Sequence, residues 1–441
     1  METPLERNPT FIPPRKATFR QRRIAKVDTK TTVPFLRPEL SEREIAEVVD
    51  TLRSGWLTTG PKVKIFEENF ARAVRGKNAV AVNSCTAALH LAVEALGLRA
   101  GQAVLVPTMT FAATAEIILY KNAVPILVDC DPVTGNMDLA DARRKIEAVR
   151  SGKLFDIAHP DIEIVGIIPV HVGGLMMDID ELKKFAAEFG LWIVEDAAHA
   201  FPSAWRKNRR SPWQYCGENT ASITCYSFYA NKTITTGEGG MAVTDNQIAA
   251  EKMRLMSLHG LSRDAWKRFT ENGNWDYRIM APGYKYNLTD IAAAIGIHQL
   301  ARAETMRRQR EQIAQMYMQK MSHIEELELP PDDENRLHSW HLFPVRLDLA
   351  KLSISRNEYI EELKRYGVGC SVHWRPLHLH PYYCEKLNWC DKELPAATQL
   401  WERLISLPIF PAMNAKEVNH TVKIVENLCM ENSKRKLFLA A

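Results

Sequence analysis

A single lysine, Lys232, lies between two strand-like runs near the middle of the chain. The runs are 221–228 and 241–244, and a polar turn containing three glycines separates the lysine from the second of them. Burial between strands disfavours the ammonium form, so it lowers the pKa of a lysine and leaves the nucleophilic amine that Schiff-base chemistry requires. The same composition also fits an exposed lysine in a hairpin turn. The rest of the chain must decide between these two interpretations.

Three other features could share a site with this lysine. An apolar run, 191–194, is followed directly by Glu195 and Asp196, which puts a carboxylate at the end of a buried strand. The polar turn 83–86 links a strand-like run to a helix that opens with small residues, and the free N–H groups of such a helix favour an anion. Taken alone, Ser84 or Thr86 could equally be an ordinary helix cap. Phe111 lies on a loop after a third apolar run.

Pyridoxal 5′-phosphate (PLP) requires this combination of groups. A lysine binds the cofactor aldehyde, and a carboxylate keeps the ring nitrogen protonated so that the ring can accept electrons. Backbone amides hold the phosphate, and an aromatic side chain can stack on the ring. We therefore expect Lys232, Asp196, the turn 83–86 and Phe111 to lie around one PLP site.

The elements that must position these residues form a repeating pattern. Strand-like runs at 79–82, 104–106, 125–128, 164–170 and 191–194 alternate with helical patterns at 87–93, 112–121, 139–149 and 180–189. This alternation predicts an α/β fold with a mainly parallel sheet, in which ligands gather at the carboxyl ends of the strands. Ser41 with Glu44 predicts a capped helix that ends at Ser54–Gly55. Beyond it, we expect helices at 291–304 and 305–321.

The length of 441 residues predicts more than one domain. We expect a basic, disordered leader at 1–30, a large domain at 31–325 and a smaller α+β domain at 326–441, with strands at 341–347 and 369–372. The leader carries eight Lys/Arg against three acids, a balance that a targeting peptide or a polyanion-binding arm would also show.

Composition narrows the possible partners. Hydrophobic residues make up 46% of the chain and charged residues 25%, as in soluble globular proteins, and the net charge of +4 is too small to indicate nucleic acid or a membrane surface. No apolar run approaches the length of a membrane span. The eight cysteines contain no CxxC pair, which suits a cytoplasmic location.

From Pro34 onward the sequence resembles the DegT/DnrJ/EryC1/StrS family of PLP-dependent sugar aminotransferases. The resemblance rests on separate motifs at 54–61, 83–90, 107–111, 195–200, 227–232, 238–240 and 283–290. It implies the fold-type I, aspartate aminotransferase-like fold. Within the family, the motifs at 338–343 and 381–383 are most similar to enzymes that aminate a UDP-linked 4-keto-pentose, the UDP-4-amino-4-deoxy-L-arabinose–oxoglutarate aminotransferases.

The resemblance implies a role for each site residue. Lys232 forms the Schiff base and shuttles the proton, Asp196 pairs with the ring nitrogen, and His199 lies near the phenolic oxygen. Phe111 stacks on the ring. The phosphate would be held by residues of two motifs and by a residue reaching over from a partner subunit: Ser84, Cys85, Thr86, Ser227 and Asn287. The active unit would then be a homodimer with shared sites.

The resemblance also implies the reaction and a substrate region. An amino group would pass, through pyridoxamine 5′-phosphate, from L-glutamate to the keto group of a nucleotide-linked sugar in polysaccharide or lipopolysaccharide synthesis. The candidate substrate residues are Thr59, Tyr286, His373 and Arg375. Cys85 stands where glycine or alanine is usual, which is harmless if only its N–H is used. The stretches 151–163 and 263–277 look longer than in relatives.

Two other functions fit part of the pattern. Some relatives are PLP-dependent sugar dehydratases with histidine in place of the lysine, and Lys232 argues against that function. A PLP-binding regulator without catalysis is the second alternative. A metal could be suspected at His373, His378 and His380, but no carboxylate or cysteine stands at ligand spacing, so we expect no metal.

Overall fold

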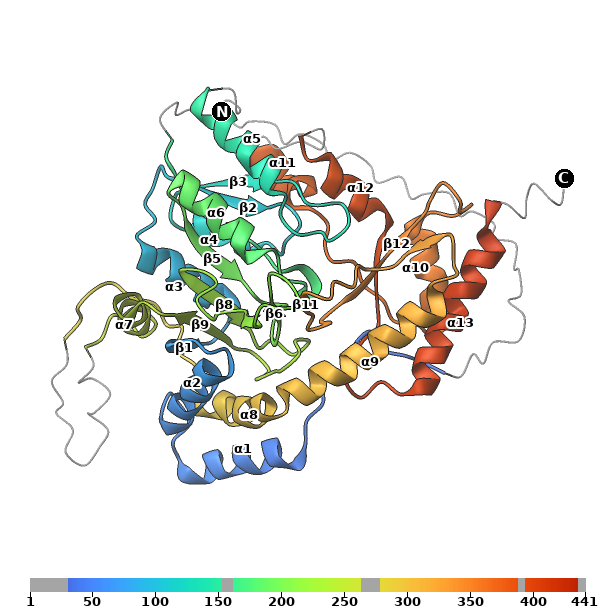
Figure 1. Ribbon diagram of the computed structural model, residues 1–441. Coiled ribbons are helices and arrows are strands. Elements are labelled where there is room, and N and C mark those ends of the chain that lie inside the picture. Colours follow the sequence, from blue (N-terminus) through green and yellow to red (C-terminus); the bar gives the residue numbers. More distant parts are fainter. Residues whose placement is uncertain (1–30, 153–161, 263–277, 388–392, 435–441) are drawn as a thin grey trace, which may run out of the picture.

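The computed structural model describes residues 31–152, 162–262, 278–387 and 393–434 (Figure 1). The predicted leader, 1–30, lies outside the described residues. So does most of the two stretches that look longer than in relatives, at 153–161 and 263–277.

A seven-stranded sheet forms the centre of the larger part of the molecule, in the order β1-β9-β8-β5-β4-β2-β3. Its strands are β1 (Asn78–Val82), β2 (Ala103–Pro107), β3 (Val124–Val128), β4 (Ile164–Ile167), β5 (Trp192–Asp196), β8 (Ile223–Ser227) and β9 (Gly240–Thr244). All neighbours from β8 to β3 pair parallel, and β9 alone runs against both of its neighbours. The predicted α/β fold with a mainly parallel sheet is confirmed.

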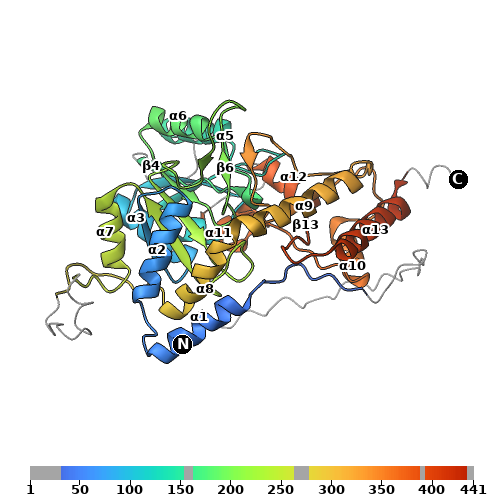
Figure 2. The same cartoon turned by 60° about the horizontal axis from the view of Figure 1, so that its bottom comes forward.

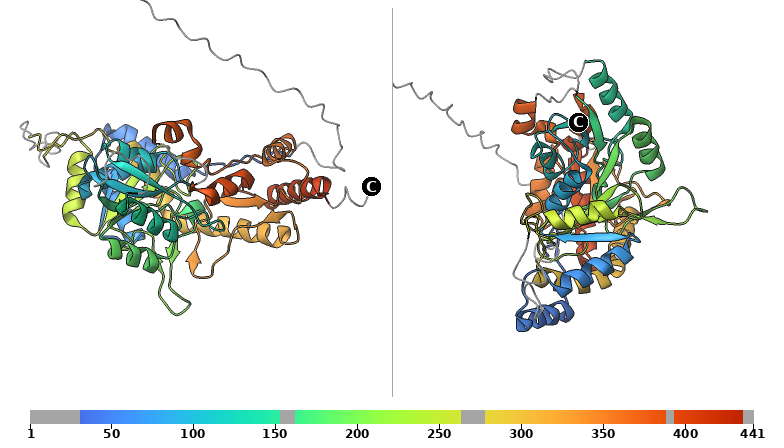
Figure 3. Two further views of the ribbon diagram at one scale, coloured as in Figure 1. Left: turned by 90° about the horizontal axis from the view of Figure 1, so that it is seen from above. Right: turned by 90° about the vertical axis from the view of Figure 1, so that its left-hand side faces the viewer.

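Helices cover this sheet on its faces and at its β1 edge (Figures 1 and 3). The helices of this part are α1 (Glu42–Ser54), α2 (Pro61–Ala73), α3 (Cys85–Leu96), α4 (Ala113–Leu119), α5 (Leu139–Arg150), α6 (Ile179–Phe189), α7 (Gln247–Met256) and α8 (Asp290–Ala301). Helix α3 packs across β1, β5, β8 and β9 and touches α4 and α7, while α2 packs on β1 and α8. Helix α3 directly follows β1, and β1 runs in the same direction as β8 and β5, so the N-terminus of α3 lies at the carboxyl ends of these strands.

The predicted start of α1 is confirmed by its cap. Ser41 accepts a hydrogen bond from a first-turn N–H, and the Glu44 carboxylate accepts one from Ser41 N at 2.9 Å. This reciprocal pair satisfies two N–H groups that the helix leaves free. Gly55 then ends the helix in a left-handed conformation at φ +74°, which a side chain would disfavour.

The remaining elements form a smaller unit at the end of the molecule opposite α7 (Figures 2 and 3). It contains α9 (Ala303–Met321), β10 (Leu327–Glu328), β12 (Phe343–Leu347), α10 (Arg356–Arg365), α12 (Pro395–Arg403), β13 (Leu404–Leu407) and α13 (Ala415–Asn432), with a three-stranded sheet β10-β12-β13. Helix α11 (Pro381–Leu387) instead packs on the larger part, where its Tyr383 joins the core around the central sheet. A second small sheet, β11-β6-β7, joins Arg336–Leu337 to Ala204–Trp205 and Gln214–Tyr215. Two short 3₁₀ turns lie at Val172–Gly174 and Leu377–Leu379.

Most buried apolar side chains fall into two clusters. The larger surrounds the central sheet, and the smaller lies among α9, α10, α13 and the β10-β12-β13 sheet. Helix α9 serves both, because Met306 packs in the first cluster and Tyr317 in the second. Val33 also belongs to the second cluster and pairs with Val368. The division at residues 325 and 326 stays a prediction. Val33 and the second half of α9 precede it in the sequence but pack in the second cluster.

Some predicted elements are shorter than expected. The apolar run 164–170 is a strand only to Ile167, because Pro169 has no N–H to donate and the chain continues with one bridge, Val170 to Asp196. The predicted strand 369–372 is wrong, since only Ser371 there forms a bridge, to Ser406.

No described helix has the length and hydropathy of a membrane span.

Candidate active site

A cavity of about 460 Å³ opens at the carboxyl ends of β5 and β8, beside the N-terminus of α3. Nine of the predicted site residues line it: Ser84, Cys85, Thr86, Phe111, Asp196, His199, Ser227, Lys232 and His373. The last of these comes from the smaller unit and the others from the larger one. The cavity therefore assembles residues that lie almost 300 positions apart in the chain.

Lys232 lies in the turn after β8, and backbone hydrogen bonds hold this turn in place. Phe228 N donates to Gly239 O at 2.9 Å, and Thr236 N donates to Phe228 O at 3.0 Å. The lysine is half-buried as a residue, but its amine lies deep enough for burial to lower its pKa from 10.5 to about 8. A surface lysine in a hairpin, the simpler interpretation of the sequence, does not describe this environment.

Asp196 ends β5 with its carboxylate in the cavity wall and only 6% of the residue exposed. The Thr114 hydroxyl donates to Oδ2 at 2.7 Å, and Ala198 N donates to Oδ1 at 3.1 Å. Burial raises the pKa of Asp196, and these two hydrogen bonds oppose the rise by favouring the ionised form. The carboxylate is thus held at both oxygens.

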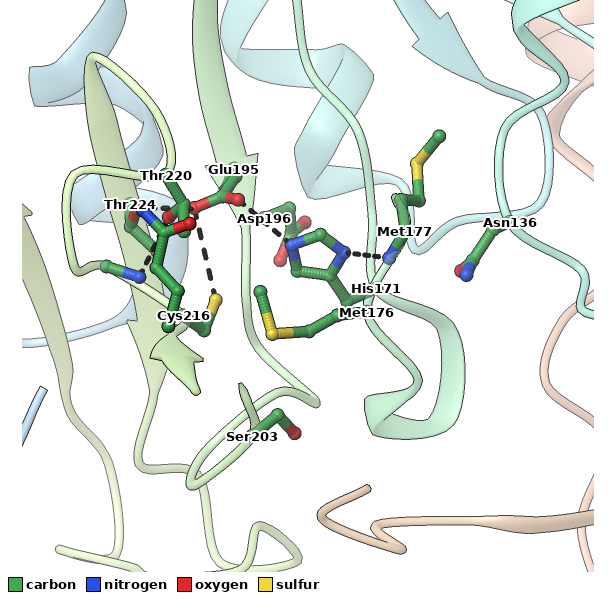
Figure 4. Close-up of polar contacts among 12 residues, drawn as sticks. Asn136, His171, Met176, Met177, Glu195, Asp196, Ser203, Cys216, Thr220 and Thr224 are labelled. Carbon is green, nitrogen blue, oxygen red and sulfur yellow. Dashed lines mark hydrogen bonds and ion pairs between the residues drawn. The ribbon is translucent and has the colours of Figure 1, made fainter. Parts of the chain in front are cut away.

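Glu195, one residue earlier on β5, points to the opposite side of the sheet and is fully buried (Figure 4). Its Oε2 accepts from Thr220 and Thr224, each at 2.6 Å, and its Oε1 contacts His171 Nε2 at 3.2 Å. Burial alone would raise the pKa of Glu195, but the hydrogen bonds from His171 and the two threonines outweigh it and lower that pKa. These bonds tie the end of β5 to β8 and to the segment after β4.

Donor atoms of His171, Glu195 and Cys216 lie within 4.8 Å of one another, close enough for metal ligands. However, His171 Nδ1 accepts from Met177 N at 3.3 Å, so Nε2 carries the ring proton and donates it to Glu195. The Cys216 thiol also lies against the same carboxylate, at 3.9 Å. The contacts among His171, Glu195 and Cys216 are therefore explained by hydrogen bonds to the Glu195 carboxylate, without a metal ion.

The N-terminus of α3 forms another part of the cavity wall. Ser84 is the helix cap, since its Oγ accepts from Ala87 N at 3.1 Å, as the simpler interpretation of this turn expected. The first-turn N–H groups that follow, of Cys85 and Thr86, have no acceptor within a helix. Strand β9 comes very close here: a Cβ on Gly240 would lie 2.4 Å from the Ser84 backbone. Glycine at 240 therefore allows the helix end to reach the cavity.

His199 lies on the cavity wall between the two units of the chain. Its Nδ1 accepts from Gly173 N at 3.3 Å, and its ring stacks on Trp374 with centroids 4.9 Å apart and planes 17° apart. Burial, followed by the nearby charges of Lys232 and His373, lowers the pKa of His199 well below its usual value. His199 is therefore neutral at physiological pH, and its Nε2 carries the proton.

Phe111 is the most exposed of these nine lining residues, with 65% of the residue accessible. A large aromatic side chain that is exposed beside the half-buried Lys232 and the buried Asp196 can offer a ring face to a planar ligand.

Four predicted site residues do not line this cavity: Thr59, Tyr286, Asn287 and Arg375. Asn287 Nδ2 donates to Thr59 Oγ1 at 2.8 Å, and the Tyr286 hydroxyl contacts His90 at 3.0 Å. The Arg375 guanidinium lies over the ring of Trp401, 5.6 Å from its centroid.

Eleven further residues line the cavity without having been predicted as site residues, and five of them carry polar or aromatic side chains: Thr110, Tyr229, Asn231, Glu238 and Trp374. Thr114, which bonds Asp196, was missed as well. No signal in the sequence marks a threonine as the partner of a carboxylate 82 residues away. The suspected metal histidines bond elsewhere instead, His373 to Ser406 at 2.9 Å and His378 to Thr108 at 2.7 Å.

Known proteins of one family match this chain over most of its length. The model of the DegT/DnrJ/EryC1/StrS aminotransferase family matches residues 38–426. The chain belongs to this family. All the residues that line the cavity lie within the matched range.

Individual relatives extend over nearly the whole chain. The uncharacterized protein MJ1066 of Methanocaldococcus jannaschii is 42% identical over 403 residues, covering 91% of this chain and 98% of the relative. The spore coat polysaccharide biosynthesis protein SpsC of Bacillus subtilis is 38% identical over 397 residues, covering 90% and 97%. Among solved structures, the PMP form of Spr1654 from Streptococcus pneumoniae, assigned as a sugar aminotransferase, has a TM-score of 0.79 at 30% identity, covering 91% and 98%. The fold-type I fold expected from the sequence is thereby confirmed.

Proposed function

We propose that the protein is a PLP-dependent aminotransferase that passes an amino group from L-glutamate to the keto group of a nucleotide-linked sugar. The observation that carries this proposal is the meeting of the Lys232 amine, the Asp196 carboxylate and the N-terminus of α3 at one cavity. Membership in the aminotransferase family supports it, and the similar protein Spr1654 has been solved in both PLP and PMP forms.

The residues present fit PLP. The Asp196 carboxylate is deeply buried and held at both oxygens, as a partner for a protonated ring nitrogen should be. The end of α3 offers first-turn N–H groups of Cys85 and Thr86 to a phosphate, with Ser227 across the cavity. Phe111 offers an open ring face. When bound, the cofactor would supply an electron-accepting ring and an aldehyde carbon that takes up the amino group from the donor and passes it to the acceptor.

The protein's own groups then have separate tasks. Lys232 binds the cofactor aldehyde through Nζ and, once released, accepts and returns a proton at the substrate carbon, which its pKa of about 8 makes feasible near neutral pH. Asp196 keeps the ring-nitrogen proton in place. His199 is neutral with its proton on Nε2, so it can donate a hydrogen bond to the phenolic oxygen without adding charge.

The substrate side of the proposal is supported by fewer residues. His373 lines the cavity from the smaller unit and is our candidate for contact with the sugar. Tyr286, Asn287, Thr59 and Arg375 do not line it, so we propose that Tyr286 and Asn287 serve the site of a partner subunit in a homodimer. The biosynthetic role of SpsC supports a product destined for a polysaccharide. The seven described cysteines are free thiols, which supports a cytoplasmic reaction.

The test is the visible absorption of the purified protein. A cofactor band that disappears on addition of L-glutamate and returns on addition of a keto sugar supports the proposal, and a panel of UDP-, GDP- and dTDP-linked keto sugars identifies the acceptor. A protein without bound cofactor, or Lys232→Ala with unchanged turnover, would refute it. A band that ignores glutamate would favour the dehydratase or regulator alternatives.

A further inference from the structure

The hydroxyl groups of Thr110 and Thr114 form a chain that ends on the Asp196 carboxylate. Thr114 Oγ1 lies 2.7 Å from Asp196 Oδ2, and Thr110 Oγ1 lies 2.6 Å from Thr114 Oγ1. An ionised carboxylate can only accept, so Thr114 donates its single proton to Asp196, and its oxygen accepts from Thr110. Asp196 therefore sets the direction of both hydrogen bonds.

The chain is almost completely shielded from water. Thr110 is 2% exposed and Thr114 is not exposed at all, yet Thr110 forms part of the cavity wall. Thr114 lies in the first turn of α4, and Thr110 lies in the loop before that helix. With little water to replace it, a donor to a buried carboxylate has a large effect on the balance between the charged and neutral forms.

The other titratable groups around Asp196 come from several elements. Lys232, from the turn after β8, favours the ionised carboxylate, and His171, from the segment after β4, would do so only in its protonated form. Cys85 on α3 and Cys225 on β8 face it as well: burial first, and the charge of Asp196 second, raise the pKa of both thiols. His199 lines the same cavity, and Glu195 points to the other side of the sheet. Among the described residues, Thr114 is the side chain that donates a hydrogen bond to Asp196.

We propose that Thr114 is a positioning residue for the PLP ring nitrogen, acting through Asp196, and that Thr110 orients its hydroxyl. This inference rests on the proposed function, because it assumes that Asp196 pairs with that nitrogen. Thr114 at Oδ2 and Ala198 N at Oδ1 fix the plane of the carboxylate before the cofactor arrives. The same bonds favour the ionised carboxylate and so oppose the rise in pKa that burial causes, which helps Asp196 to hold the proton on the nitrogen.

The experiment compares three threonine-to-valine variants, each of which exchanges one buried hydroxyl for a methyl group. Thr114→Val removes the donor to Asp196, and Thr110→Val removes the group that orients that donor. Thr108→Val is the matched control, because Thr108 is equally buried on the same segment but bonds His378, at 2.7 Å, instead of Asp196. The dissociation constant of PLP is measured on the apoproteins from pH 5 to 9, together with the melting temperature of each apoprotein.

For Thr114→Val we expect PLP affinity at pH 7 to fall about tenfold, and the pH below which affinity is lost to rise by about one pH unit. Thr110→Val should shift both in the same direction by less, and Thr108→Val should shift neither. Thr114→Ser, which restores the hydroxyl, should return both values toward those of the wild type. A purely structural threonine would change the melting temperature without moving the pH dependence.

The outcomes separate the inference from the function on which it rests. If wild-type apoprotein does not bind PLP, the proposed function fails. If it binds but Thr114→Val matches it at every pH, or Thr108→Val shifts the pH dependence as much, the inference is wrong. Should Thr114→Val not fold, Thr110→Val carries the test, and an unchanged pH dependence in that variant would overturn the inference.

Discussion

The amine of Lys232 should titrate near pH 8 in the apoprotein. Burial lowers its pKa from 10.5 to about 8, and negative charge on Cys85 or Asp196 opposes the fall. Burial also raises the pKa of the Cys85 thiol, which keeps it neutral in this range, so Asp196 is the charge that acts. At pH 7.5 about a quarter of the Lys232 amines would be neutral, against roughly one in a thousand for an ordinary lysine.

The assay is competitive labelling of the apoprotein with a trace of acetic anhydride between pH 6 and 11, followed by mass spectrometry of the peptide that contains Lys232. Lys64, whose side chain is 77% exposed, is the internal reference. We expect a midpoint near pH 8 for Lys232. Asp196→Asn removes the stabilising charge and should lower this midpoint by about one pH unit. Cys85→Ala, which removes a neutral thiol, should leave it unchanged.

Two results would refute this reasoning. A midpoint at or above pH 10 would mean that water reaches the amine freely, so that the lysine is not desolvated in the apoprotein. A midpoint that rises in Asp196→Asn would show that the carboxylate is not an ionised neighbour of the amine, and the proposed pairing of the two groups would fall with it.

Three further outcomes follow from the same geometry. Phe111→Ala should weaken PLP binding about tenfold but leave the apoprotein's melting temperature almost unchanged, since the side chain is largely exposed; an equal loss of both would contradict this. Mixing inactive Lys232→Ala with inactive Asn287→Ala should restore about a quarter of the activity if sites are shared between subunits, and no recovery would argue against sharing. Glu195→Gln should lower the unfolding free energy at pH 7 by about 1–3 kcal/mol. Because hydrogen bonds lower the pKa of Glu195, its contribution is present above about pH 4.5 and lost below it, so urea unfolding of the variant should depend less on pH there.

Much of the fold could be predicted because local rules and packing agree. The capping box at Ser41 and the alternation of apolar runs with helices each specify one structure, and the sheet places Asp196 and Lys232 on one edge as expected. The exceptions have local causes. The apolar run predicted a strand that continues through residue 170, but β4 ends at Ile167 because Pro169 has no N–H to donate to a neighbouring strand.

The site was predictable only where chemistry demands a residue type. A Schiff base needs an amine and a ring nitrogen needs a carboxylate, so Lys232 and Asp196 stand out against their surroundings. Thr114 and Trp374 could be replaced by many types without disturbing any local pattern, and only the fold brings them to Asp196 and His199. Supporting residues of this kind can be identified from contacts in the folded structure but not from the hydrophobic pattern of the sequence.

The exposed aromatic side chains at the cavity connect the cofactor to the proposed dimer. Phe111 and Tyr229 both line the cavity, and they are 65% and 48% exposed in the single chain. Large apolar side chains that gather at one open cavity usually face a ligand or another protein. A bound cofactor ring would cover Phe111. Tyr229 lies three residues before Lys232, in the same turn, and its exposed ring is our candidate for a surface that the proposed partner subunit covers. The Phe111→Ala variant therefore tests whether the cofactor ring covers one side of the cavity. The complementation experiment tests whether a second copy of the chain contributes the remaining residues.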